Sequence, residues 1–298
     1  MKRKINRVGP STLTVSLPSK WAKNLGLKAG NEIEVEERAN QLVLSRERTI
    51  EKKDITIHYP SKQRFLKRFL VSAYIKGYDT IQVTYDDPVL FGLVQETMNK
   101  LLLGFEVVEH SKDRCVLKNI AEGMEYEFDN TQRKYFLHIK QLLSHLIEAI
   151  QNKDPQELEH LLFVDQTVDK LCQFIRRMLN IHGYKDDSKG KSLYFIDNLL
   201  ESIADHCRDI AKHMQRTGIY PSSDFLVLLK QVAQNIETYY QLFYTFNREK
   251  LVDLKERDVQ IKKSVLEQIE KHEHQHFLFY HHLLGMTEIC HDLSEEMG

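Results

Sequence analysis

The sequence predicts a multidomain α+β protein with a small N-terminal β domain, a small α/β middle domain and a C-terminal all-α bundle. Residues 11–18, "STLTVSLP", alternate apolar and polar side chains, which is the pattern of a half-buried strand. Between residues 54 and 120, strand-type runs alternate with helix-type runs. From about residue 130 onward, apolar residues recur with the period of a helix. We therefore expect domains at residues 1–50, 51–122 and 128–298, because 298 residues are too many for one small core.

The N-terminal segment reads as strand, short helix, strand, turn and strand. A strand at 11–18 ends at Pro18, and a short amphipathic helix follows from Ser19. The chain turns at Gly30 and continues as two strands, one through Ile33 and Val35 and one at 40–46. Fewer than 50 residues cannot bury a core of useful size alone, so we expect this domain to form a homodimer.

Positive charge is concentrated at the N-terminus. Residues 1–28 contain seven Lys or Arg and no Asp or Glu, whereas the whole chain has a net charge of −1. A basic segment on an otherwise acidic chain indicates a polyanionic partner such as nucleic acid, with a solvated basic surface as the alternative. The candidate DNA-binding residues are Lys2, Arg3, Lys4, Arg7, Lys20 and Lys23.

Residues 9–36, "GPSTLTVSLPSKWAKNLGLKAGNEIEVE", resemble the AbrB/MazE/SpoVT family of DNA-binding domains. The resemblance implies a swapped-hairpin β domain in which two chains interlace, with basic side chains near the first strand and helix meeting double-stranded DNA. Arg7 and Lys23 stand where that family commonly has arginines, and Thr14 stands where many members have another. Some relatives act as antitoxins or use the fold only to dimerise, so the fold alone does not establish DNA binding.

The middle domain shows an α/β pattern without a chemical motif. Strand-type runs occupy 54–59, 79–85, 105–110 and 114–120, and helix-type runs occupy 61–77 and 88–104. The sequence contains no Gly-rich phosphate loop and no nucleophile elbow here. We interpret this part as a spacer or a dimerisation module, with a ligand pocket as an alternative that no motif supports.

The C-terminal part predicts six helices arranged as a duplicated three-helix unit. Setting Asp165 on Asp258 aligns the second helices at an offset of 93, and setting Glu201 on Glu288 aligns the third helices at 87. We therefore expect a bundle of two repeats, at about 128–217 and 221–298. The expected helices lie near 131–152, 155–181, 191–216, 222–246, 249–270 and 272–296.

Each third helix carries two carboxylates one helical turn apart, Glu201 with Asp205 and Glu288 with Asp292. Like charges at this spacing repel by about 0.2–0.5 kcal/mol in an isolated helix, and a bound cation would remove that repulsion. Helical phase places Asp197 with Glu201 and Asp205, opposite the apolar stripe of their helix.

The second helix of each repeat adds a carboxylate near its apolar side. Asp165 lies at the margin of the apolar stripe and Asp258 lies within it. A carboxylate in a core position has to be paired, hydrogen-bonded or metal-bound. Oxygen-rich sites of this kind suit hard or borderline cations, including iron. Solvated helix faces with ordinary surface acids are the alternative.

The two three-helix repeats with (Glu/Asp)-x-x-x-Asp on their third helices, best seen in "ESIADHCRDIA" at 201–211, resemble the PhoU family. The resemblance implies a role in phosphate-transport regulation and binding of iron or zinc ions. Lys262 takes the place that corresponds to Asp169, so the second site has lost a carboxylate. The implied metal ligands are Asp165, Asp169, Glu201, Asp205, Asp258, Glu288 and Asp292.

Several features bound the location and the class of function. The longest apolar runs, such as 225–229, are far shorter than a membrane span, and no N-terminal signal is visible. The four cysteines form no Cys-x-x-Cys pair, which favours buried thiols in the cytoplasm. No Ser-His-Asp or Cys-His set is readable, so we do not expect an enzyme.

Together, the resemblances imply an archaeal-type PhoU-related transcriptional regulator of phosphate uptake that binds DNA as a homodimer. An alternative is an adaptor that acts on the ATPase of a phosphate ABC transporter and uses its N-terminal domain only to dimerise. A weaker alternative is a di-iron carboxylate protein, since Glu157-x-x-His160 and Glu288-x-x-His291 match the Glu-x-x-His unit of such bundles.

Overall fold

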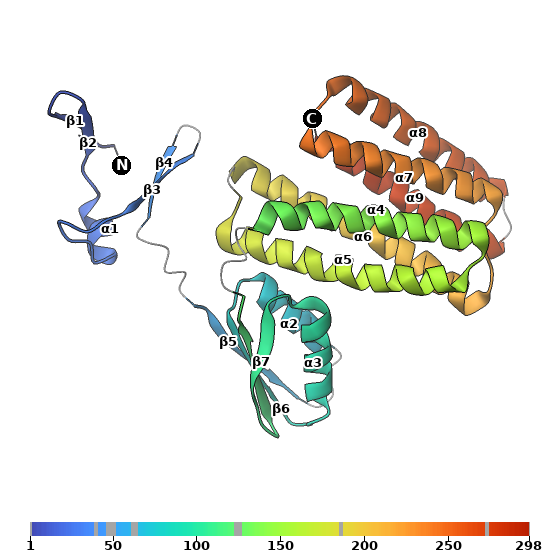
Figure 1. Ribbon diagram of the computed structural model, residues 1–298, viewed down its shortest axis with the longest axis horizontal. Coiled ribbons are helices and arrows are strands. Elements are labelled where there is room, and N and C mark those ends of the chain that lie inside the picture. Colours follow the sequence, from blue (N-terminus) through green and yellow to red (C-terminus); the bar gives the residue numbers. More distant parts are fainter. Residues whose placement is uncertain are drawn as a thin grey trace. The chain divides into compact units, whose positions relative to one another are not determined.

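The computed structural model describes residues 2–38, 41–45, 52–60, 65–121, 127–184, 187–271 and 274–297. The chain divides into two compact units, Met1–Glu51 and Lys52–Gly298. Figure 1 shows a strand-rich N-terminal segment, a small sheet with two helices, and a long helical bundle. The predicted α+β class, with its order of β, α/β and all-α parts, is confirmed.

The N-terminal unit contains two short hairpins and one helix. The hairpins pair β1 (Ile5–Val8) with β2 (Thr12–Val15) and β3 (Glu34–Arg38) with β4 (Gln41–Ser45), and α1 (Ser19–Asn24) lies between them in sequence. Strand β1 was not expected, because its four residues are too few to establish an alternating pattern. Gly9 permits the first hairpin turn, since its φ of 73° is strained for other residues.

Apolar side chains of this unit remain exposed. Ile5, Leu13 and Leu42 are 68%, 66% and 66% exposed, and none of the unit's side chains with a described burial is buried. In the single chain, the N-terminal unit therefore lacks a buried hydrophobic core, as expected for so short a segment.

The α/β part is built on a four-stranded mixed sheet. Its strand order is β5-β6-β8-β7, with β5 (Asp54–Tyr59) parallel to β6 (Thr80–Tyr85) and the other pairs antiparallel. Helix α2 (Leu66–Ile75) connects β5 to β6, and α3 (Leu90–Leu101) leads to β7 (Phe105–His110) and β8 (Arg114–Asn119). The first four residues of the expected helix at 61–77, residues 61–64, lie outside the described residues.

The bundle contains the six expected helices, and each end lies within four residues of its expected position. One apolar core joins both repeats, because α6 packs against α9 and α4 packs against α7. The four cysteines are buried and unpaired. The helices are α4 (Phe128–Asn152), α5 (Pro155–His182), α6 (Asp187–Thr217), α7 (Ser223–Tyr244), α8 (Arg248–Lys271) and α9 (His274–Glu295). Within the described part of the chain, none of the helices combines the length and apolar character needed to cross a membrane.

A buried arginine forms hydrogen bonds between the bundle and the α/β part. Arg177 on α5 is 1% exposed and donates hydrogen bonds to the backbone oxygens of Tyr74 (2.7 Å) and Tyr78 (2.8 Å) and to Asp79 Oδ1 (2.8 Å). Its guanidinium also lies over the rings of Tyr74 and Phe105. A buried charge is tolerated when all its hydrogen-bonding partners are present. Removing one member of a buried charged pair lowers the free energy of unfolding by several kcal/mol. Arg177 therefore orients α2 and the turn that follows it against α5.

Replacing this arginine tests the contact. We expect Arg177→Met to lower the free energy of unfolding by about 3 kcal/mol, because two buried carbonyls and Asp79 lose their donor. The measurement is urea unfolding of the whole chain. Lys170→Met is the matched control, since Lys170 Nζ donates only one hydrogen bond, to Asn99 O (2.9 Å), at the exposed edge of the same contact. The control should be destabilised by about 1 kcal/mol or less, and equal destabilisation of both variants would contradict the assignment.

Candidate metal centre in the first helical repeat

Three aspartates from two helices meet in the first repeat. Asp165 and Asp169 lie one turn apart on α5, and Asp205 projects from α6. One carboxylate oxygen from each lies within 4.8 Å of the others. Asp165 is buried, and Asp169 and Asp205 are partly buried. All three belong to the set of ligands expected from the sequence.

The electrostatics of this group favour a bound cation. Burial, with the negative charge of Asp169 second, raises the pKa of Asp165 to about 7. Burial, followed by the charges of Glu201 and Asp205, raises the pKa of Asp169 to about 6. Asp165 Oδ1 has no hydrogen-bond partner among the described residues. A divalent ion would favour the ionised carboxylates and satisfy this oxygen, so the donor set fits a hard or borderline cation such as iron or zinc.

Glu201 lies beside this group and is ion-paired with an arginine. Its Oε2 accepts a hydrogen bond from Arg176 at 2.7 Å. Asp205 is also ion-paired, with Arg208 on the next turn of α6. Although both side chains pair with an arginine, among the described residues only the oxygen of Asp205 joins those of Asp165 and Asp169 at ligand distance, and Glu201 lies at the edge of the centre.

The position predicted for Asp197 is wrong. Helical phase placed Asp197 on the polar side with Glu201, but its side chain is completely buried and accepts a hydrogen bond from Gln132 Nε2 at 2.7 Å. Helix α6 contacts α4, α5 and α9, so a larger part of its circumference is buried than a single apolar stripe predicts. Burial raises the pKa of Asp197 to about 7. This carboxyl belongs to the packing between α4 and α6.

The second repeat does not reproduce the cluster. Asp258 is buried as expected, but its Oδ1 accepts from Asn235 Nδ2 at 2.6 Å. Glu288 is exposed and ion-paired with Lys262 at 3.1 Å, and Asp292 is exposed. Within the described ranges, these three carboxylates form no group at ligand distance. Lys262 on α8 corresponds to Asp169 on α5. It therefore gives Glu288 a positively charged partner, where the first repeat has another carboxylate.

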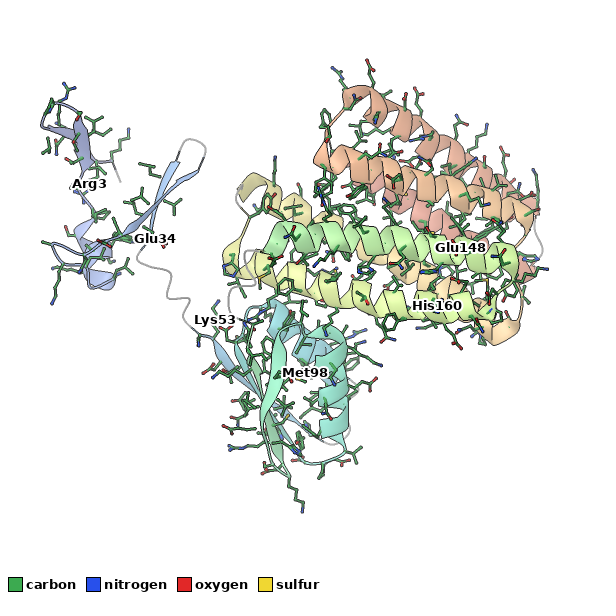
Figure 2. All side chains as sticks on the ribbon, in the orientation of Figure 1. Arg3, Glu34, Lys53, Met98, Glu148 and His160 are labelled. Carbon is green, nitrogen blue, oxygen red and sulfur yellow. The ribbon has the colours of Figure 1, made fainter. Side chains whose placement is uncertain are left out.

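A second group with metal-binding chemistry was not expected. His145 and Glu148 on α4 and Glu157 on α5 place their ligand atoms within 4.8 Å of one another, and His145 Nδ1 lies 2.7 Å from Glu157 Oε2. His160 Nδ1 lies 3.7 Å from Glu157 Oε1, and Figure 2 shows Glu148 and His160 on these neighbouring helices. The signal in the sequence is the spacing of three between His145 and Glu148 and between Glu157 and His160, on consecutive helices.

The residues do not fit a di-iron carboxylate bundle. That fold needs both Glu-x-x-His pairs to project into the bundle core. Glu288 and His291 are exposed, and they pair on the surface with Lys262 (3.1 Å) and Glu295 (3.6 Å).

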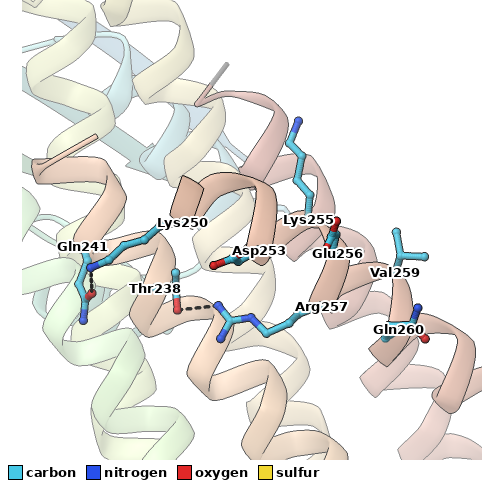
Figure 3. Close-up of a pocket in the computed structure, with 9 residues that line it drawn as sticks. All are labelled: Thr238, Gln241, Lys250, Asp253, Lys255, Glu256, Arg257, Val259 and Gln260. Carbon is cyan, nitrogen blue, oxygen red and sulfur yellow. Dashed lines mark hydrogen bonds between the residues drawn. The ribbon is translucent and has the colours of Figure 1, made fainter. Parts of the chain in front are cut away.

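Two of the hollows formed by the described residues are relevant to the site. One of about 980 Å³ lies between α7 and α8, where Arg257 donates to Thr238 (2.9 Å) and Lys250 donates to Gln241 (3.4 Å), as Figure 3 shows. Its walls carry both signs of charge, and none of the expected carboxylate ligands lines it. The other, of about 880 Å³, opens beside Asp169 and Asp205 and is bordered by α2, α5 and α6.

The basic residues expected to bind DNA lie on the surface of the N-terminal unit. Arg7 is on β1, and Lys20 and Lys23 are on α1, all with exposed side chains. Lys2, Arg3 and Lys4 precede β1 and are also exposed. Among the described residues from 2 to 28, no carboxylate is present to neutralise them.

Comparisons with known proteins identify two segments. Residues 7–53 match the family model described as antidote-toxin recognition MazE, bacterial antitoxin. Residues 133–214 match the PhoU domain, a range that covers most of the first three-helix repeat, including the three clustered aspartates. No curated protein and no solved structure matches the chain significantly. The chain thus joins a MazE-like N-terminal segment to a PhoU domain.

The buried carboxylate predicts a specific dependence of stability on pH. The pKa of Asp165 is raised from 3.8 to about 7, so the metal-free folded state holds its proton more tightly than the unfolded chain. This contribution to stability is complete below about pH 4 and disappears as the pH rises through about 7. Between about pH 8 and pH 5, the wild type should therefore gain about 1–2 kcal/mol relative to Asp165→Asn.

Urea unfolding with a chelator present measures this difference. Asp292→Asn, a change at an exposed carboxylate, should follow the wild-type profile. Parallel profiles for the wild type and Asp165→Asn would show that Asp165 is not held in a pKa-raising environment.

Proposed function

We propose that this protein is a DNA-binding transcriptional regulator of phosphate uptake whose PhoU-type part responds to phosphate or to the state of the transporter. The observation that carries the proposal is the union, in one chain, of a MazE-like segment and a PhoU domain. A DNA-binding type of domain joined to a domain associated with phosphate regulation is the organisation of a ligand-responsive regulator. The cytoplasm is the compartment where such a protein would meet DNA.

The charge and exposure of the N-terminal unit support DNA binding as a homodimer. The six exposed basic residues can contact phosphates, and such contacts supply most of the affinity of non-specific DNA binding. The exposed Ile5, Leu13 and Leu42 give a second copy of the same unit an apolar surface to cover. Interlaced hairpins from two chains would bury this surface and place two sets of basic residues on one duplex.

The aspartate cluster supports a metal-dependent helical part. Asp165, Asp169 and Asp205 would hold an iron or zinc ion, and Glu201 would stay with Arg176 at its edge. The ion would supply positive charge and open coordination positions next to the cavity beside α2. The second repeat, with Lys262 paired to Glu288, would contribute packing rather than a second metal site.

Binding to DNA is tested through its dependence on salt. The logarithm of affinity should fall linearly with the logarithm of salt concentration, and Arg7→Ala/Lys23→Ala should show a slope shallower by about 0.9 for each phosphate that the variant no longer neutralises. Fluorescence anisotropy with the protein's own genomic fragments gives this slope. Lys28→Ala is the matched control, since Lys28 is an exposed lysine of the same unit outside the candidate set.

Recovery of fragments upstream of phosphate-transport genes would support the regulator. If a folded dimer retains no fragment, the protein instead acts as an adaptor on the ATPase of a phosphate ABC transporter.

The metal centre is tested by affinity measurements on matched carboxylates. We expect Asp169→Asn and Asp205→Asn each to weaken binding of zinc or ferrous ion by about tenfold or more, because each removes one of three charged donors. Asp292→Asn, in the corresponding helix of the second repeat, should bind like the wild type. The measurement is metal titration of the metal-free protein, supported by elemental analysis of the purified wild type. Equal metal affinity in the wild type and all three variants would show that the clustered aspartates do not bind the metal.

A further inference from the structure

The cavity beside the aspartate cluster is shared between the α/β part and the bundle. It has a volume of about 880 Å³, which lies in the range of small-molecule sites. One wall is a single face of α2 with Lys67 and Arg68, continued by Lys76 at the C-terminal cap of the helix, and the opposite wall contains Asp169 and Asp205. Two helices of the PhoU-matched segment and one helix outside it therefore build this site.

The cations of α2 have no anionic partner at ion-pair distance. Within the described residues, Lys67 and Lys76 make no ion pair or hydrogen bond, and Arg68 contacts only the ring face of Phe65, at 5.4 Å. In contrast, the arginines of the bundle wall are already paired, Arg176 with Glu201 and Arg208 with Asp205 and Asp209. The lining contains five cationic and three anionic side chains, so the charge left over is positive and lies on α2.

Two buried polar side chains in the lining also lack partners. Gln173 and Arg176 are 7% and 8% exposed, and both line the cavity. Gln173 Oε1 and Arg176 Nε have no hydrogen-bond partner among the described residues. Buried polar atoms are rarely left unsatisfied in native proteins, and a polar ligand is one way to satisfy them. Independently of the surface lysines, Arg176 Nε is a buried donor that an anion in the cavity can satisfy, whereas Gln173 Oε1 is an acceptor that needs a donor such as water or a hydroxyl group.

We propose that this cavity binds a phosphate group, with Lys67, Arg68 and Lys76 of α2 as its charge partners. The inference rests on the proposed function, because a divalent ion held by Asp165, Asp169 and Asp205 would cancel two of their three negative charges. With a divalent ion in place, repulsion from the carboxylates is largely removed and the cations of the α2 wall dominate, whereas without the ion the carboxylates repel an anion. The α/β part, for which the sequence favoured a spacer or a dimerisation module and no motif supported a ligand pocket, thereby becomes half of the sensor.

Two sources of a phosphate group fit this chemistry. Free orthophosphate would occupy a small part of the cavity, and a phosphorylated small molecule such as a nucleotide would fill more of it. Tyr194 lines the same cavity, where its ring already lies 5.9 Å from the guanidinium carbon of Arg176. An aromatic ring of this kind could contact the organic part of a nucleotide. Orthophosphate and AMP are therefore separate arms of one experiment.

The experiment measures how phosphate changes the affinity of the whole protein for Mn²⁺, a stand-in for ferrous ion that does not oxidise readily. Free Mn²⁺ is followed by electron paramagnetic resonance, with sulfate at equal ionic strength as the reference anion and protein-free samples to correct for Mn²⁺ bound by the anions. Coupled ligands change each other's affinity reciprocally. We expect orthophosphate or AMP to tighten Mn²⁺ binding by about fivefold or more in the wild type.

Matched variants locate the effect. Lys67→Gln/Lys76→Gln removes two exposed charges without ion-pair partners, so it should keep the fold and bind Mn²⁺ in sulfate, yet no longer show the tightening by phosphate. Lys100→Gln is the control on the same α/β part, because Lys100 pairs with Glu96 at 2.7 Å and does not line the cavity. It should respond to phosphate as the wild type does.

The outcomes separate this inference from the proposed function. If Mn²⁺ binds and neither anion changes its affinity, or if Lys67→Gln/Lys76→Gln responds like the wild type, the phosphate site is wrong and the metal centre stands. If the wild type binds no Mn²⁺, the metal centre is wrong and the phosphate site, which requires it, fails too. A larger effect of AMP than of orthophosphate would identify a phosphorylated small molecule as the ligand, and the reverse would identify the free ion.

Discussion

Burial of charge along α5 is the constraint on which the rest of unit Lys52–Gly298 depends. The middle of this helix carries Asp165 and Asp169 against α6, and its C-terminal part carries Arg177 against the α/β part. A charge removed from water needs a partner of opposite charge or a complete set of hydrogen bonds. Arg177 finds its partners within the protein, whereas Asp165 does not. The first arrangement stabilises a contact between two parts of the chain, and the second leaves a site that a cation can stabilise.

The two repeats differ in how they stabilise a buried aspartate. Both place an aspartate of the second helix in the core, Asp165 and Asp258. In the second repeat Asn235 donates to that aspartate, and Lys262 neutralises the neighbouring acid Glu288. In the first repeat acids face acids. Burial raises the pKa of the core aspartate in both repeats, to about 7 for Asp165 and to about 6 for Asp258, so the repeats differ in the residues around that aspartate. The two repeats therefore share a helical framework, while the first groups three aspartates and the second pairs its acids within the protein.

This division gives the α/β part a clear place in the molecule. In the described part of the chain, α5 is the bundle helix that makes the main contact with α2 and α3. Arg177 on α5 stabilises this contact through its hydrogen bonds. A ligand bound between α2 and the aspartate cluster would act on the same contact from its other side. Because β5 directly follows the N-terminal unit in the chain, a change in α2 lies one strand away in sequence from the segment that matches a MazE antitoxin.

The sequence by itself determined the α+β class, the order of the three parts and the extents of the six bundle helices, because apolar periodicity, capping residues and turn residues are local signals. It also singled out Asp165, Asp169 and Asp205, through spacing on a helix and resemblance to a repeat. It could not separate these three from Glu201, nor from the carboxylates of the second repeat. That distinction depends on which charged side chain reaches across from a neighbouring helix, as Arg176 does to Glu201 and Lys262 does to Glu288.

Tertiary structure alone decided the burial of Asp197 and the mixed wall of the cavity beside α2. A helical phase argument assumes one buried stripe, and it fails where three neighbours cover a helix, as they cover α6. The cations on α2 and the acids on α5 and α6 belong to different parts of the chain, far apart in sequence, so no local pattern relates them. Their meeting follows from the packing of the α/β part on the bundle, which the buried Arg177 directs.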